Sequence, residues 1–306
     1  MTDSLIDEAV RLLRAGGVIA LPTETVYGLA ADASNDDAVR RIYAIKGRPA
    51  DHPLIVHLPS REALARYVGA PSPWLAPLVA RFWPGPLTVV VRKSSAVSDL
   101  VTGGQDTVAL RLVDHPVTSA ILARFGRAIA APSANRFGRV SPTTAQHVRD
   151  DLGSDVDLVV DGGPARIGIE STIVDLTGDV PAILRAGVIT ATALRATLGI
   201  EVVTRTGGTV RAPGMLAAHY APKATLVLVS EAERVAEVQR RTDRGERAIL
   251  FEMPSGAADT ARELYFRLRA LDDAGYDTIV ASLPPDSEEH AAVRDRLTRA
   301  TTHFPI

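Results

Sequence analysis

Two basic residues, Lys46 and Arg48, stand two positions apart in the stretch IYAIKGRPADHPLIVHL, which covers residues 42–58. Apolar residues of the segment 39–43 follow the i, i+3, i+4 spacing of an amphipathic helix, and Lys46 falls at the next position of that stripe. An apolar run typical of a strand follows soon afterwards. The sequence therefore predicts two cations where one buried element ends and the next begins.

Gly47 and Pro49 shape the backbone around these cations. Pro49 disfavours helical geometry for the residue before it, and Gly47 permits a sharp exit from the helix. Lys46 and Arg48 would then converge on one point, which suits a phosphate, because Lys offers a point charge and Arg a planar bidentate donor. The alternative is a solvated helix end, where cations interact favourably with the helix dipole. The sequence leaves both interpretations open.

Two further segments place polar side chains after predicted strands. PTETVYG, residues 22–28, offers three hydroxyls and a carboxylate, which could bind a small polar ligand or simply cap a turn. PSANRFGRVSPTT, residues 132–144, offers Ser133, Asn135 and Ser141, although most loops of this composition have no further role. Ser141 could instead cap the helix that begins near residue 143.

Other basic residues occupy comparable positions. Arg111 lies within VALRLVDHP, a run typical of a buried strand, where an Arg needs an anionic partner. Arg185 ends the strand AILRAG, and His57 stands at another strand end. A lone His is more often structural, but several basic residues at strand ends favour a shared anionic ligand.

Several kinds of site are excluded by absent residues or motifs. The chain has no cysteine, which removes disulfides, thiolate zinc sites and a Cys nucleophile. GxxxxGK[ST], GxSxG, HExxH and the kinase signature are all missing. A net charge of −2 argues against a general polyanion-binding surface, although a local basic cleft remains possible.

The elements that must position these residues form an α/β pattern. With 306 residues, 46% hydrophobic and 23% charged, the chain can fold as two packed domains. Residues 1–200 alternate strands and helical patterns, many joined by short loops, which predicts a twisted mixed sheet. The predicted strands are Val18–Leu21, Leu54–His57, Leu87–Val91, Val108–Leu112, Ala128–Ala131, Leu158–Val160, Thr172–Leu176 and Ala182–Leu184. The predicted helices lie near 36–46, 60–68, 73–82, 116–125, 143–150 and 190–198.

A linker and a small second domain follow. Residues 201–224 contain Gly-Gly, two Pro and little periodicity, which indicates a linker that could be a passive tether. Residues 225–306 repeat strand and helix three times, which predicts a small Rossmann-like parallel α/β domain in three layers. The N-terminus should form a helix capped by Asp3 or Ser4 and stopped by Gly16, rather than a secretory signal. No apolar run could span a bilayer, so we expect a soluble, cytoplasmic protein.

These segments together resemble a known family. The resemblance is to threonylcarbamoyl-AMP synthases in their long two-domain form, whose short form is the YrdC-like domain alone. It is strongest over residues 17–190, clear in the linker and weaker in the C-terminal domain. The matching segments, in order, are LPTETVYGLAADA, IKGRPADHPLIVHL, FWPGPLTVVV, VALRLVDHP, APSANRFGRVSPT, DGGPARIGIESTIVDL, ILRAG and APGMLAAHYAPKA.

The resemblance implies an activity and a set of site residues. The family makes threonylcarbamoyl-AMP and pyrophosphate from L-threonine, bicarbonate or CO2, and ATP, and passes the product to a transferase that modifies tRNA. Residues matching its catalytic KxR…SxN signature are Lys46, Arg48, Ser133 and Asn135. The implied ATP contacts are Arg48, His52, Thr107, Ser133, Ser141, Arg185 and Tyr220. The implied threonine contacts are Thr25, His57, Arg111, Ser171 and the backbone of Ala131.

The resemblance also implies Mg2+, held mainly by the ATP phosphates, since no carboxylate cluster for a metal is apparent. No covalent intermediate is needed, in agreement with the missing nucleophile motifs. This sequence departs from the family pattern at His52, where Asn is commoner, at LRAG in place of LRPG, and in the apolar residues before HYAP. A side chain of the linker should fold over the site, and either His219 or Tyr220 could supply it.

Two other functions remain as alternatives. An RNA-binding module would show salt-dependent affinity, but the net charge and the 5% of aromatic residues count against it. Carbamoyl transfer to another acceptor is chemically closer to the family reaction. Direct tRNA binding and the oligomeric state are not decided by the sequence.

Overall fold

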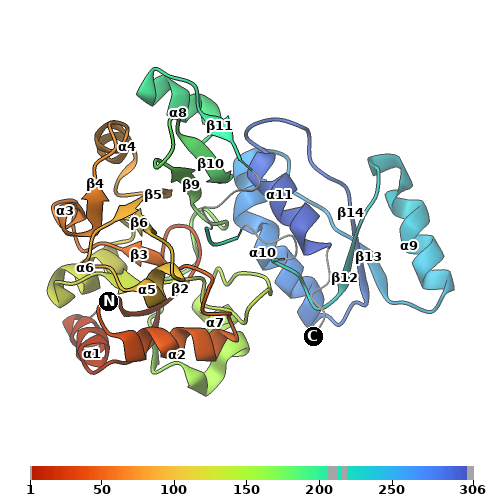
Figure 1. Ribbon diagram of the computed structural model, residues 1–306. Coiled ribbons are helices and arrows are strands. Elements are labelled where there is room, and N and C mark those ends of the chain that lie inside the picture. The colour runs from red at the N-terminus through yellow and green to blue at the C-terminus, as the bar shows by residue number, and fades with distance from the viewer. Residues whose placement is uncertain (1, 206–211, 215–218, 302–306) are drawn as a thin grey trace.

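The computed structural model describes residues 2–205, 212–214 and 219–301. Its elements form two sheets, a large mixed one and a small parallel one, each with its own helices (Figure 1). The large sheet has the order β11-β10-β9-β5-β6-β3-β7-β2-β1-β8, with β4 paired to β5. Antiparallel pairs such as β5 with β6 stand beside parallel pairs such as β3 with β6, so the predicted mixed sheet is confirmed.

The elements of the first part of the chain surround this sheet. Its strands are β1 (Ile19–Leu21), β2 (Gly28–Asp32), β3 (Ile55–His57), β4 (Val68–Ala70), β5 (Leu87–Lys93), β6 (Thr107–Arg111), β7 (Ile129–Ala130), β8 (Leu158–Val159), β9 (Thr172–Asp175), β10 (Ala182–Arg185) and β11 (Val203–Thr204). Its helices are α1 (Asp3–Arg14), α2 (Asp36–Lys46), α3 (Leu64–Tyr67), α4 (Leu75–Phe82), α5 (Asp99–Thr102), α6 (Pro116–Phe125), α7 (Ala145–Leu152), η1 (Gly153–Asp155) and α8 (Ala191–Leu198).

All eight predicted strands of this part are present, but the structure adds others. β2 was not predicted because GLAAD holds small residues rather than the β-branched and aromatic residues that mark strands. β4, β11 and α5 are too short to give a periodic signal. The capping of α1 was predicted wrongly, since Thr2 is the N-cap residue and Asp3 already lies in the first turn.

The second part of the chain builds a three-stranded parallel sheet. Its elements are β12 (Thr225–Leu228), η2 (Glu231–Glu233), α9 (Arg234–Asp243), β13 (Ala248–Leu250), α10 (Ala257–Asp273), β14 (Thr278–Ala281) and α11 (Ala291–Ala300). β14 lies in the centre and pairs in parallel with both neighbours. Figure 1 shows α9 on the outer side of this sheet and α10 and α11 on the side that faces the large sheet. The predicted three-layer parallel domain is confirmed.

The two sheets are joined by a shared apolar core. Val26, Val140 and Tyr220 pack in one cluster with Tyr265 on α10 and Leu297 on α11. Burial of apolar surface stabilises such contacts by about 25 cal/mol per Å2. The second domain is therefore packed against the first through residues of α10 and α11.

The linker is only partly described. Tyr220 is 1% exposed, and the amide of Ala221 donates to the carbonyl of Gly138 at 2.9 Å, so this end of the segment is not a passive tether. The apolar residues 215–218 before HYAP lie outside the described residues. The predicted boundaries at residues 200 and 224 stay predictions.

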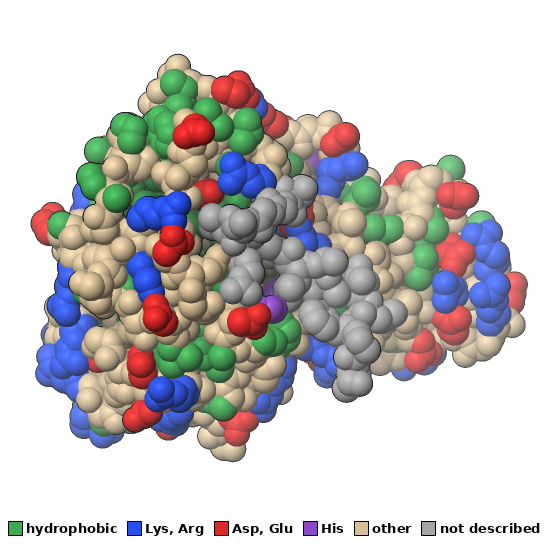
Figure 2. All heavy atoms as spheres, in the orientation of Figure 1, with side chains coloured by type: hydrophobic (Ala, Val, Ile, Leu, Met, Phe, Trp, Pro, Cys, Tyr) green, Lys and Arg blue, Asp and Glu red, His purple; other side chains and the backbone are tan. Residues whose placement is uncertain are grey.

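The surface carries charges of both signs. On the face shown in Figure 2, Lys and Arg side chains are interspersed with Asp and Glu over both domains. Within the described ranges, no helix is long and apolar enough to cross a membrane.

Candidate active site

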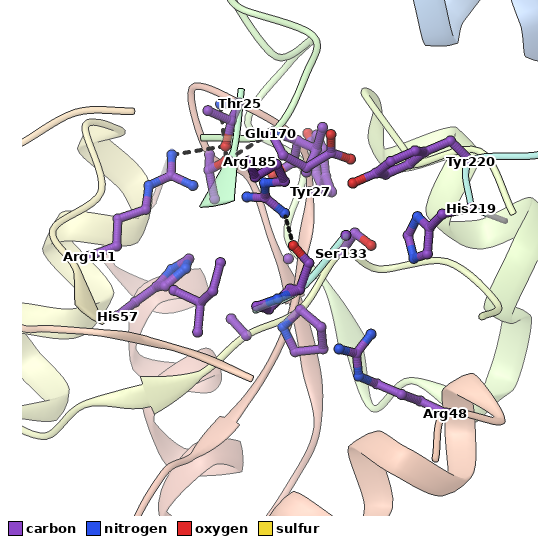
Figure 3. A pocket seen from close by; sticks show the side chains of 18 residues that line it. Thr25, Tyr27, Arg48, His57, Arg111, Ser133, Glu170, Arg185, His219 and Tyr220 are labelled. Atoms are coloured by element: carbon purple, nitrogen blue, oxygen red, sulfur yellow. Dashed lines mark hydrogen bonds between the residues drawn. The ribbon is translucent and has the colours of Figure 1, made fainter. Parts of the chain in front are cut away.

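A pocket lies between the large sheet, the loop after β7 and the described end of the linker. Three arginines from separate parts of the chain line it: Arg48 after α2, Arg111 on β6 and Arg185 on β10. Figure 3 shows Arg111 and Arg48 on opposite sides, with Arg185 between them. All three guanidinium groups belong to side chains that are less than 9% exposed. A pocket with this charge is suited to a ligand that carries several negative charges.

Arg111 and His57 form one end of the pocket. The parallel register of β3 and β6 sets these two residues side by side. Arg111 Nη2 donates to Thr25 Oγ1 at 2.8 Å and also lies 2.8 Å from Glu24 Oε2. The predicted anionic partner of Arg111 is thus supplied by Glu24 within the chain. Burial, together with the charge of Arg111, lowers the pKa of His57 well below its usual value, so its imidazole is neutral near pH 7.

Neither of the two interpretations left open by the sequence holds for Lys46, which is 3% exposed and so not a solvated helix end, but does not line the pocket beside Arg48. Gly47 adopts φ +64° and ends α2, so that Arg48 leaves the helix and lines the pocket. Arg48 Nη2 donates to the carbonyl of Pro53 at 3.0 Å, and burial lowers the pKa of Arg48 to about 10. Lys46 is not among the lining residues. Its Nζ donates to the carbonyls of Ser133 and Asn135 at 2.5 and 2.6 Å, and burial and the nearby Arg48 lower its pKa.

Arg185 is held by Ser171, the residue before β9, and by the linker. Its Nε and Nη2 donate to the backbone oxygen and the hydroxyl of Ser171, both at 3.1 Å. Its Nη1 donates to the carbonyl of Pro213 at 3.0 Å. Burial lowers the pKa of Arg185 from its usual value. Ser171 therefore orients an arginine of the pocket and does not itself line it.

The loop after β7 contributes Ala131, Pro132 and Ser133 to the pocket lining and uses other side chains for its own structure. Ser133 lines the pocket, whereas Asn135 Nδ2 donates to the carbonyls of Arg136 and Arg139 at 2.8 Å. Ser141 donates to Glu170 Oε1 at 2.6 Å. The alternative that Ser141 caps a helix is wrong, because Thr144 is the N-cap residue of α7.

The predicted site residues thus fall into two groups. Those that line the pocket are Thr25, Arg48, His57, Arg111, Ala131, Ser133, Arg185 and Tyr220. Those that lie outside its lining are Lys46, His52, Thr107, Asn135, Ser141 and Ser171. Among the latter, His52 contacts the Phe137 ring, with centroids 5.5 Å apart, and Thr107 begins β6 opposite Arg92.

Sequence reasoning missed several lining residues, of which Glu170 is the most informative. It is 6% exposed and stands in the motif GIEST, just before β9. A carboxylate next to a buried strand is unusual unless it is paired with a cation or a hydrogen-bond donor. This position in the sequence is the feature by which Glu170 could have been predicted. Tyr27 was also missed as an individual residue, and its hydroxyl donates to the carbonyl of Gly163 at 2.7 Å.

His219 and Tyr220 line the pocket from the described end of the linker, and Figure 3 shows both on the same side of it. Their rings lie 4.1 Å apart between centroids, and Tyr220 has φ +65°, which is uncommon for a residue other than Gly. In the part of the chain that the structure describes, the Tyr220 hydroxyl and His219 Nδ1 are buried without hydrogen-bond partners. Burial lowers the pKa of His219 to about 3. Both side chains therefore offer unused polar groups to a ligand.

The described residues do not assemble a cluster of metal ligands. Across the described ranges, no three His, Asp or Glu residues are grouped as a metal site. Glu170, the carboxylate of the pocket lining, already accepts hydrogen bonds at both oxygens. The pocket therefore favours anions over bare cations.

The fold and the pocket together define a two-domain α/β protein. Its pocket is lined by three buried arginines and suits a small ligand that carries several negative charges. The comparisons with known proteins make this specific. A family model described as "Telomere recombination" matches residues 11–187, and one described as "Threonylcarbamoyl-AMP synthase, C-terminal domain" matches residues 189–302. The chain belongs to the threonylcarbamoyl-AMP synthase family.

Relatives match over nearly the whole length. The threonylcarbamoyl-AMP synthase of Bacillus subtilis is 40% identical over 97% of this chain and 93% of that protein. The Pyrococcus abyssi enzyme of the same name is 38% identical over 96% of this chain and 93% of that protein. The crystal structure of P. abyssi Sua5 complexed with L-threonine has a TM-score of 0.93 at 36% identity, covering 98% of this chain and 95% of that one.

Proposed function

We propose that this protein forms threonylcarbamoyl-AMP and pyrophosphate from L-threonine, bicarbonate and ATP, for the modification of tRNA. Family membership supports the reaction, and the pocket supports the substrates. The observation that carries the proposal is that Arg48, Arg111 and Arg185 line a single pocket. Triphosphate, carboxylate and bicarbonate are all anionic, and only a cationic pocket could hold them side by side.

The two ends of the pocket suit different substrates. At the Arg111 end, the neutral His57 and the Thr25 hydroxyl stand beside a guanidinium, a combination that can bind the carboxylate and hydroxyl of threonine. The complex of P. abyssi Sua5 with L-threonine is consistent with this end being an amino-acid site. At the other end, Arg48, Arg185 and the free Tyr220 hydroxyl can hold phosphates.

The chemistry needs positioning more than it needs a reactive side chain. The neutral threonine amine adds to CO2 formed from bicarbonate, and the proton it loses combines with the hydroxide left from bicarbonate to form water, which gives N-carboxythreonine. Its carboxylate oxygen then attacks the α-phosphorus of ATP, the bond to the β-phosphate oxygen breaks, and pyrophosphate leaves. Arg48 and Arg185 would neutralise the charge that develops on the phosphates, and the pocket would hold the two reactants in contact.

Mg2+ would accompany ATP rather than occupy a site built by the protein. The polar groups of the described pocket lining are mainly guanidinium groups and hydroxyls, which supports a metal held mostly by the phosphates. Bound in this way, the metal would add charge neutralisation at the phosphate oxygens. The downstream transferase that accepts the product and the cytoplasmic location stay predictions of the sequence.

The test is pyrophosphate release from purified protein, with threonine, bicarbonate and ATP omitted one at a time. We expect release only when all three are present with Mg2+. Equal release without threonine would favour carbamoyl transfer to another acceptor. No release, combined with RNA affinity that falls steeply with salt, would favour the RNA-binding alternative.

A further inference from the structure

Glu170 links the pocket to the C-terminal domain. Its carboxylate accepts hydrogen bonds from Ser141 Oγ at 2.6 Å, from the Tyr265 hydroxyl at 3.0 Å and from Arg296 Nε at 2.9 Å. Ser141 belongs to the first domain, whereas Tyr265 lies on α10 and Arg296 on α11. A residue that lines the active-site pocket is therefore held from the other domain.

Arg296 makes more contacts with the site than this ion pair alone. Its side chain is 0% exposed, and its Nη2 donates to the carbonyl of Ala186, the residue that follows Arg185. Its Cζ lies 4.9 Å from the centre of the Tyr220 ring, within the range of a cation–π contact. One side chain of α11 thus touches a lining carboxylate, a lining aromatic ring and the backbone beside a lining arginine.

The contact of Arg296 with Tyr220 acts on a side chain whose polar end is not held by a hydrogen bond from the part of the chain that the structure describes. Tyr220 holds a backbone conformation with φ +65°, and its hydroxyl has no hydrogen-bond partner among the described residues. Packing by Arg296 on one side and by the Tyr265 ring, 5.8 Å away between centroids, restricts where the Tyr220 ring can lie. The Arg296 guanidinium also balances the Glu170 charge inside the pocket wall.

We propose that Arg296 is a positioning residue that the C-terminal domain supplies to the active site, acting through Glu170 and Tyr220. The inference rests on the proposed function for its kinetic readout, although the placement of Tyr220 can be tested without turnover. It assigns the C-terminal domain a direct part in forming the pocket. Docking of α11 then completes the site, in addition to stabilising the fold.

Arg269 provides a matched control in the same interface. It lies on α10 and is 8% exposed. Its Nη1 donates to Oδ1 of Asp151, a residue of the first domain, at 3.0 Å. Its other partners are the backbone oxygens of Val140 and Ser141. None of these residues lines the pocket. Arg269→Met and Arg296→Met thus each remove one buried interdomain arginine, but only the second touches the lining.

The experiment compares R296M, R296K, E170Q, the double variant E170Q/R296M and R269M. Pyrophosphate release gives kcat and KM for ATP and for threonine, at a temperature where circular dichroism shows each variant folded. We expect R296M to lose about 100-fold in kcat/KM for ATP, the scale of a small misplacement of reacting groups, and R269M to stay within about 3-fold of wild type. R296K should recover part of the loss, and the double variant should lose little more than R296M alone, because the two residues act together.

Crystal structures of R296M and R269M provide a second readout that does not depend on turnover. A shift of the Tyr220 ring in R296M but not in R269M would support the proposal. Equal kinetic losses in R296M and R269M, or an unchanged Tyr220 and Glu170 in the R296M crystal, would overturn it. If the wild-type protein released no pyrophosphate, the proposed function would fail, and the crystal structures would still decide the positioning role.

Discussion

Lys46 Nζ and the backbone oxygen of Ser133 are joined by a hydrogen bond of 2.5 Å, although the two residues are 87 positions apart. The same nitrogen donates to the carbonyl of Asn135. Lys46 therefore fixes the backbone of the loop after β7, from which Ser133 enters the pocket. Its neighbour Arg48 enters the pocket directly, so the two cations of one motif have different tasks.

Substitution of Lys46 by Ala should therefore affect stability and activity together. Two buried carbonyls would lose their donor, which we expect to cost about 2 kcal/mol of unfolding free energy. Pyrophosphate release should fall as well, because the loop loses its fixed position. Urea unfolding and steady-state kinetics measure the two effects. The exposed Lys223→Ala serves as control, and full activity in a destabilised K46A would show that the loop does not depend on Lys46.

Arg48→Ala should impair pyrophosphate release far more than folding. The variant loses a guanidinium that lines the pocket. The backbone partners of Arg48, the carbonyls of His52 and Pro53, lie in the loop between α2 and β3 and not in the core of the sheet. We expect a loss of about 100-fold or more in kcat/KM, and Arg48→Lys should restore only part, since an ammonium lacks the planar fork. Thermal denaturation is measured in parallel. A melting-temperature loss that accounts for the whole activity loss would make Arg48 structural.

Gly214→Ala should disturb Tyr220. A Cβ at this position would overlap the Tyr220 hydroxyl and lie 2.9 Å from Arg185 Cδ. Gly245 has the same φ of +86° but no atom near its own Cβ position, so G245A carries the backbone strain without the overlap. We expect both variants to lose about 1 kcal/mol of stability, and only G214A to lose about 10-fold or more in activity. Equal kinetics of the two variants would show that activity does not depend on the position of the Tyr220 side chain.

Glu170 should make the stability of the protein depend on pH in acid. Burial alone would raise its pKa, but the charges of Arg296 and Arg185 and the Ser141 hydroxyl lower the pKa to about 2, from the ordinary glutamate value of 4.5. Because the folded-state pKa lies below that of the unfolded chain, this stabilisation is present above pH 4.5 and is lost as the pH falls toward 2. The full effect is about 3 kcal/mol.

The comparison of wild type with E170Q measures this contribution. Urea unfolding is measured at several pH values between about 5 and about 2.5, a range that covers most of the interval between the unfolded and folded pKa values of Glu170. The difference in unfolding free energy between wild type and E170Q should narrow as the pH falls. The other carboxylates contribute equally to both proteins and cancel in the difference. A difference that stays constant with pH would show that folding does not lower the pKa of Glu170.

The candidate site could be anticipated in part from the sequence. Arg48, Arg111 and Arg185 stood out because cations at strand ends or inside apolar runs need a reason to be there. Glu170 and Tyr220 did not stand out in the same way, since their roles depend on contacts with α10 and α11. The division between Lys46 and Arg48 also escaped local reasoning, because the acceptors of Lys46 belong to a distant loop.

The sequence alone determined the order of most strands and helices, the mixed α/β class, the parallel C-terminal domain and the motifs that resemble the family. These follow from hydrophobic periodicity, turn residues and motif order, all of which are local in the chain. Only the tertiary structure decided which basic groups line the pocket, that Glu24 pairs with Arg111, and that Arg296 reaches the site from the second domain. The physical reason is that hydrogen bonds and ion pairs between distant residues depend on how the sheets pack, and no spacing along the chain records that packing.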